Sequence, residues 1–129
     1  MTTRQFWLIV CTLMIPTAYQ RTKFAINRTL FNKTRLRDKS KLNIHHGHWG
    51  LLIVFVSTWL LVFGVHDSFS IGLAGLGWGL MLDEIIPMLK MPSIGRYKEL
   101  EVYSDSRNAT IILVSLVVTM TMVVFLTHN

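Results

Sequence analysis

The sequence predicts an all-α, polytopic integral membrane protein with about four transmembrane helices, in which the two central helices form a tight helical hairpin. Three observations support this fold class. Hydrophobic residues make up 51% of the 129 residues and charged residues only 16%, unlike an ordinary soluble domain. The apolar residues occur in long blocks and do not alternate with polar ones. The charges are concentrated between those blocks. A chain of this length is at most one compact unit, so residues 1–129 are predicted to form a single membrane domain.

The first predicted helix covers about residues 6–20, FWLIVCTLMIPTAYQ. This block is short for a membrane span and contains Pro16, which is expected to kink the helix or end it. We interpret it as a retained membrane helix, tilted or kinked. The alternatives are a helix that only lies at the interface, which would leave three spans, and a cleaved signal peptide, whose apolar core has a similar length.

The second and third predicted helices cover about residues 48–65 and 70–89 and are separated by the polar connection around His66 and Asp67. A connection this short favours two antiparallel helices. The third helix contains Gly75 and Gly79 in a G-x-x-x-G spacing, which places small residues on one helix face and lets another helix approach closely in a membrane. These glycines are therefore interpreted as packing residues.

The fourth predicted helix covers about residues 109–126, a block rich in Val, Ile and Thr. Ser106 or Asn108 is expected to cap its N-terminus.

The distribution of basic residues predicts the orientation of the chain. Eight of the 13 lysine and arginine residues lie in residues 21–41, where the only acidic residue is Asp38. Basic loops are typically cytoplasmic and attract anionic lipid headgroups. We therefore expect a cytoplasmic basic loop at residues 21–41, a location in the plasma or inner membrane, and the lipid bilayer, not nucleic acid, as the partner of this positive charge.

Ionisable residues at membrane depth need an energetic explanation. Asp83 and Glu84 lie inside an apolar block, where a charged carboxylate costs about 2.5 to 3.5 kcal/mol near the bilayer centre. Folding the central hairpin about residues 66–68 brings these carboxylates to the level of HHGH, residues 45–48. His45 and His48 are three residues apart and share a helix face, if the helix includes both. The sequence therefore predicts that His45, His48, Asp83 and Glu84 converge, with His46 pointing elsewhere.

Nitrogen and carboxylate ligands at one level would suit Zn, Fe, Mn or Cu, so these four residues are candidate metal ligands. Two alternatives remain open. One is a metal-free cluster that holds the hairpin in register by hydrogen bonds, and the other is a pair of carboxylates that relay protons or other cations. Cys11 is the only cysteine, which excludes a CxxC metal or redox site.

The sequence does not identify a reaction or a catalytic residue. G-x-S-x-G, Walker A, H-E-x-x-H and dinucleotide-binding motifs are absent. The histidines around residue 46 are also too few for the di-metal centre of histidine-box membrane desaturases and hydroxylases. The competing function class is a non-enzymatic accessory subunit that binds other membrane subunits or self-associates. Small size and glycine-rich packing faces favour that class.

Overall fold

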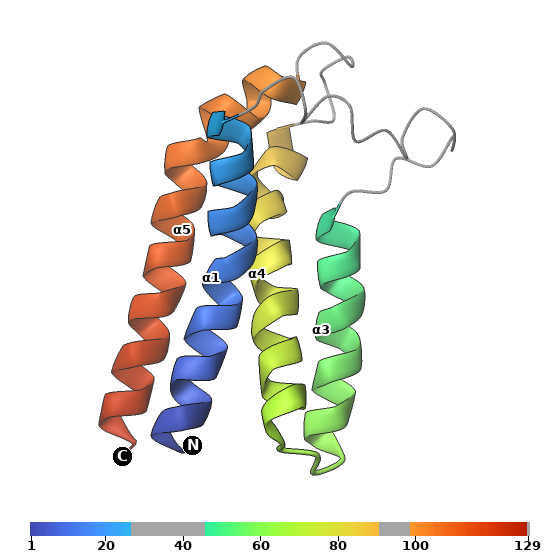
Figure 1. Cartoon of the computed structure of the whole chain (residues 1–129), viewed down its shortest axis with the longest axis vertical. Coiled ribbons are helices and arrows are strands. Elements are labelled where there is room, and N and C mark those ends of the chain that lie inside the picture. Colours follow the sequence, from blue (N-terminus) through green and yellow to red (C-terminus); the bar gives the residue numbers. More distant parts are fainter. Residues whose placement is uncertain (27–45, 91–98, 129) are drawn as a thin grey trace.

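The protein is a bundle of helices. The computed structural model describes residues 1–26, 46–90 and 99–128. In these residues it contains four helices, α1 (Thr3–Ile26), α3 (His46–Val62), α4 (Ser68–Lys90) and α5 (Glu99–Thr127). Both chain termini lie at one end of the bundle, and the C-terminal ends of α1 and α4 lie at the other end (Figure 1). The predicted all-α class and the four helices are confirmed.

Helix α4 is the central element, because it packs against each of the other three helices and most extensively against α3 and α1. Glycines make these close contacts possible. A methyl group added at Gly50 of α3 would lie 2.7 Å from the backbone nitrogen of Met81, and one at Gly77 would lie 2.8 Å from the backbone nitrogen of Val54. Gly75 and Gly79 of the G-x-x-x-G pair face α1 instead. Glycines therefore allow the close contact of α4 with α3 at Gly50 and Gly77, and its close contact with α1 at Gly75 and Gly79.

Helix α1 continues through Pro16 and ends at Ile26, so the expectation that Pro16 ends the first helix is wrong. A proline removes one helical hydrogen bond and crowds the preceding turn. Here Pro16 lies against a neighbour without a side chain, since a methyl group at Gly79 would be 3.0 Å from its Cδ atom.

Two helix boundaries also differ from the sequence-based ones. Helix α1 includes Arg21 and Lys23, which were assigned to the basic loop, and α5 begins at Glu99, ten residues before the apolar block that predicted it. Both extensions are polar, and hydropathy locates only the apolar part of a helix. The rest of the basic loop, residues 27–41, lies outside the described residues.

The turn between α3 and α4 has well-defined caps at both helix ends. Gly64 has a φ of 82°, and the N–H groups of Gly64 and Val65 donate to the carbonyls of Leu61 and Leu60, which is a Schellman motif. The carboxylate of Asp67 then accepts a 2.8 Å hydrogen bond from the backbone N–H of Ser70. This bond lowers the pKa of Asp67, as expected for an N-cap of α4.

Gly64→Ala is expected to lower the free energy of unfolding by about 1 kcal/mol, because an L-residue with a side chain is strained at positive φ. No other atom lies within 4 Å of the added methyl group, so the effect is purely conformational. Denaturant unfolding in detergent micelles measures it. Gly64→Asn is the control and should lose less, since asparagine tolerates this conformation. Equal stability of all three proteins would contradict the assignment of this turn.

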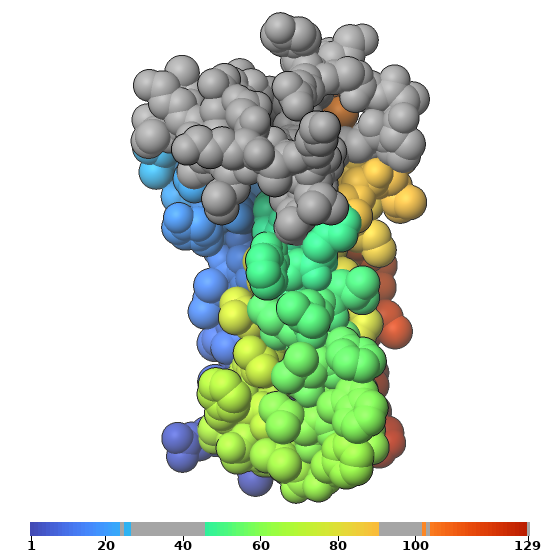
Figure 2. Space-filling model, turned by 90° about the vertical axis from the view of Figure 1, so that its right-hand side faces the viewer, coloured from blue at the N-terminus to red at the C-terminus, as the bar shows by residue number. Residues whose placement is uncertain are grey.

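Two of the helices are long and apolar enough to cross a membrane, α4 over Ser68–Lys90 and α5 over Ser104–Thr127, and α3 is a shorter apolar helix. Large apolar side chains also cover the outside of the bundle. On α3 and the turn that follows it they include Phe55, Trp59 and Phe63, which form a ladder of neighbouring rings and are each more than half exposed. Figure 2 shows the side of the molecule on which α3 lies at the front. The small core is formed inside the bundle by Leu13, Leu82 and Val114.

Candidate functional site

Four ionisable side chains from three helices meet at the end of the bundle where α1 and α4 end and α3 begins. They are Arg21 of α1, His46 of α3, and Asp83 and Glu84 of α4. Both carboxylates are completely buried, whereas the side chains of Arg21 and His46 are 12% and 25% exposed. We call this group the ionic cluster. The surroundings of the bundle therefore contact only the basic side chains, Arg21 and His46, and not the two carboxylates.

Asp83 is the centre of the cluster on the α1 side. Nε of Arg21 lies 3.1 Å from Oδ1 of Asp83, and an Nη2 hydrogen of Arg21 points to the backbone carbonyl of Asp83 at 3.3 Å. The same guanidinium donates to the hydroxyl of Thr110 in α5 at 3.1 Å. Thr110 is fully buried. One arginine therefore links α1, α4 and α5, using the several donors that the guanidinium presents in a fixed geometry.

His46 joins the two carboxylates on the α3 side. Its Nε2 lies 2.6 Å from Oε1 of Glu84 and 3.4 Å from Oδ2 of Asp83. A proton on Nε2 is thus shared between two acceptors. If His46 carries a second proton, the imidazolium and Arg21 together balance the two carboxylates, and the buried cluster has no net charge. Charge balance of this kind is what allows carboxylates to be buried at all.

The local sequence explains why the cluster forms. Asp83 and Glu84 are adjacent on a helix of 3.6 residues per turn, so their side chains leave α4 in directions about 100° apart, one toward α1 and the other toward α3. Gly47 then lets the first turn of α3 approach Glu84, because a methyl group at Gly47 would lie 2.8 Å from the Cβ atom of Glu84. This approach brings the neighbouring His46 ring to the carboxylates.

The four residues predicted to bind a metal do not all meet. Asp83 and Glu84 are in the cluster, but His48 is exposed on the other side of α3, where it lines a groove between α3 and α4. His45 lies outside the described residues. Among those residues, no group of three or more His, Cys, Asp or Glu side chains is arranged to hold a metal ion.

The histidine that contacts the carboxylates is His46, which the sequence-based reasoning directed elsewhere. His46 is the first described residue of α3, and the helical spacing proposed for His45 and His48 involves a residue outside the described part of the chain. Arg21 and Thr110 were also missed. A signal for Arg21 was present, since it is the first basic residue after the first apolar block and therefore lies toward the same end of the bundle as Asp83. Nothing in the sequence indicated Thr110.

A comparison of the chain with protein-family models, with curated proteins and with solved structures finds no match. The fold and the cluster together define a class of protein, a bundle of four described helices in which buried ion pairs join α1, α3 and α4 and a hydrogen bond from Arg21 to Thr110 adds α5. Chemically, such a cluster can fix the helices relative to one another, or it can hold a proton between His46 and two carboxylates.

Proposed function

We propose that this chain is an integral membrane protein in which all four helices span the bilayer, with the ionic cluster near the cytoplasmic face. The apolar outer surfaces of α3 and α5 support this placement, because soluble proteins rarely expose apolar patches of such extent. Arg21 and Lys23, the described basic residues of the sequence segment 21–41, lie in the last turns of α1 at the same end as the cluster, and basic loops are typically cytoplasmic.

Cysteine labelling tests this topology. In a Cys11→Ala background, Ser68→Cys places a thiol at the turn between α3 and α4, and Ser40→Cys places one in the basic segment. A membrane-impermeant maleimide is expected to label Ser68→Cys in intact cells and Ser40→Cys only after permeabilisation. The reverse pattern would invert the orientation, and recovery of the protein in the soluble fraction would refute the membrane placement.

We further propose that the protein acts as a non-enzymatic subunit of a membrane complex and that the ionic cluster has a structural role, which is to hold the helices in fixed positions relative to one another. We call this role a clasp. One observation carries this proposal: both carboxylates that the sequence singled out as chemically costly are wholly buried and are engaged by basic side chains from two other helices. A reaction centre must keep its ionisable groups accessible to a substrate. A cluster that only holds helices together has no such requirement. The chain is also small and uses its glycines for internal packing.

Native electrophoresis of the tagged chain, solubilised from its own membranes in a mild detergent, tests the subunit role. The chain is expected to migrate as a large assembly and, after purification in a harsher detergent, as a much smaller species. The double variant Arg21→Met/Asp83→Leu removes one ion pair without leaving a buried charge, and a clasp role predicts that it still enters the assembly. Migration of the wild-type chain as a single stable monomer in both detergents would contradict the proposal.

A metal centre and a cation relay are the competing functions, and each has a distinct test. Mass spectrometry of purified protein is expected to find no stoichiometric metal in the wild type or in His46→Ala/Glu84→Gln and His45→Ala/His48→Ala. Stoichiometric Zn, Fe, Mn or Cu that is lost in either variant would replace the clasp with a metal site. Proton flux into proteoliposomes that disappears in Asp83→Asn/Glu84→Gln would instead favour a relay, for which the position of His46 between two carboxylates is suited.

A further inference from the structure

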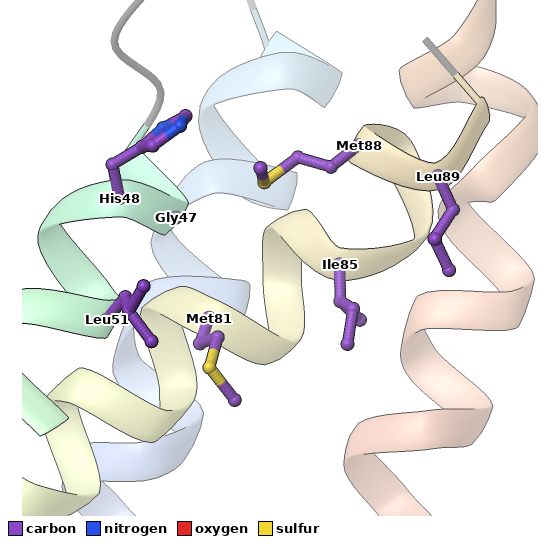
Figure 3. Close-up of a pocket in the computed structure, with 7 residues that line it drawn as sticks. All are labelled: Gly47, His48, Leu51, Met81, Ile85, Met88 and Leu89. Atoms are coloured by element: carbon purple, nitrogen blue, oxygen red, sulfur yellow. The ribbon is translucent and has the colours of Figure 1, made fainter. Parts of the chain in front are cut away.

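An open groove lies between the first two turns of α3 and the last turns of α4, on the outside of the bundle. It has a volume of about 350 Å³, at the lower end of the roughly 300–1,000 Å³ typical of small-molecule sites. Three lining residues come from α3 and four from α4 (Figure 3). The groove is almost entirely apolar, and its walls include Leu51, Met81, Ile85 and Met88.

The groove results from the close approach of the two helix backbones. A methyl group at Gly47 would lie 3.0 Å from the sulfur of Met88, and Gly50 is in contact with the backbone of α4. Larger side chains on either side of these glycines form the walls of the groove, and the glycines lie at its shallow floor. Two of the wall residues are methionines, whose unbranched and polarisable side chains adapt to the shape of a flexible ligand. Leu51 and Leu89 are largely exposed, so the groove is open to the surroundings of the bundle.

One end of the groove carries basic residues. His48 lies in the first turn of α3, and Lys90, which is exposed, directly follows Leu89 of the groove wall. The nearby carboxylates of Asp83 and Glu84 do not offset this charge at the surface, because both are fully buried and engaged by Arg21 and His46. The groove therefore combines an apolar channel with an imidazole, that of His48, and a lysine ammonium, that of Lys90, at the membrane face that is predicted to be cytoplasmic.

We propose that this groove binds an anionic membrane phospholipid, with an acyl chain along Leu51, Met81 and Ile85 and the phosphate headgroup beside His48 and Lys90. Charge complementarity selects this occupant, since basic pockets between membrane helices at the cytoplasmic side bind anionic lipid headgroups. The proposal rests on the membrane placement proposed above but is independent of the clasp and subunit roles.

Native mass spectrometry of the full chain in detergent tests the proposal, with an equimolar mixture of dioleoyl phosphatidylglycerol and dioleoyl phosphatidylcholine as the probe. The wild type is expected to retain the anionic lipid in clear preference. A lysine near an anionic headgroup contributes about fivefold to such binding, so His48→Ala/Lys90→Ala, which also removes the imidazole hydrogen-bond donor, should bring the ratio of the two bound lipids close to one. Lys23→Ala removes a positive charge at the same end of the bundle, but on α1, and should leave the ratio unchanged.

The apolar part of the groove needs a separate variant. Ile85→Trp fills the channel and should reduce binding of both lipids several-fold, whereas Ile112→Trp on the exposed face of α5 should not. Three results would each overturn the proposal. Ile85→Trp and Ile112→Trp could lose equal amounts of bound lipid, the lipid ratio could stay unchanged in His48→Ala/Lys90→Ala, or the ratio could fall as far in Lys23→Ala as in that double variant.

Two further outcomes identify other occupants and would also overturn it. Displacement of the lipid by millimolar glycerol 3-phosphate would show that a free phosphate compound is the ligand. A dimer that disappears in Ile85→Trp would show that a second copy of the chain covers the groove. Failure of the membrane placement is distinguishable from all of these results, because alkaline carbonate would then extract the wild-type chain from membranes regardless of its lipid binding.

Discussion

Replacing Asp83 with leucine is expected to lower the free energy of unfolding by about 3 kcal/mol, because removing one partner of a buried ion pair leaves a desolvated charge behind. Asp83 is completely buried, and its Oδ1 accepts a hydrogen bond from Nε of Arg21 at 3.1 Å. The substitution takes away the carboxylate that balances this guanidinium and also one acceptor of His46. We place the effect at the lower end of the usual range because the Arg21 side chain is 12% exposed. Denaturation by dodecyl sulfate in mixed micelles, followed by circular dichroism, measures it.

Two variants separate this explanation from a general effect of losing an acidic residue. Asp105→Leu removes an exposed carboxylate from α5 and is expected to change the stability by no more than about 0.5 kcal/mol. Arg21→Met/Asp83→Leu replaces the buried pair with apolar side chains and should recover more than half of the loss. A double variant that is no more stable than Asp83→Leu alone would show that the uncompensated Arg21 charge is not the cause.

The all-α class and the four helices could be predicted because long apolar blocks are a property of the sequence itself. The hairpin between α3 and α4 was predictable for a similar reason, since the polar connection around Asp67 is too short for any other arrangement. Helix ends were less predictable. The polar residues around Arg21 continue α1, and those after Glu99 begin α5, but hydropathy cannot distinguish a polar helical turn from a loop.

Which histidine joins the ionic cluster depended on the rotation of α3 about its own axis. His46 faces Asp83 and Glu84, whereas His48 lines the groove on the outside of the bundle. A rotation of 100° per residue means that an error of a single residue selects a different histidine. Arg21 was missed because its partner is 62 residues away in the chain, and a pairing at that separation depends on how α1 packs against α4.

Gly79→Ala is expected to lower the free energy of unfolding by about 2 kcal/mol, within the range for overpacking a close contact. The added methyl group would collide with the carbonyl oxygen of Leu13 and lie 3.0 Å from Cδ of Pro16. The backbone of α1 has no rotamer that relieves this contact, so α1 must move away from α4. Gly72→Ala, on the same helix, is the matched control. Its methyl group meets only Leu8 at 3.7 Å, and alanine should be neutral or slightly stabilising there.

The same displacement should weaken the ionic cluster, because Gly79 and Asp83 are four residues apart and lie on the same face of α4. Moving α1 outward at Gly79 lengthens the separation between Arg21 and Asp83. The effects of Gly79→Ala and Asp83→Leu are therefore expected to be less than additive by at least about 0.5 kcal/mol, whereas Gly72→Ala and Asp83→Leu should add. Strict additivity of Gly79→Ala with Asp83→Leu would mean that the glycine contact and the ion pair hold α1 independently. Coupling would mean that the close approach at glycine is what brings Arg21 within reach of the buried carboxylate.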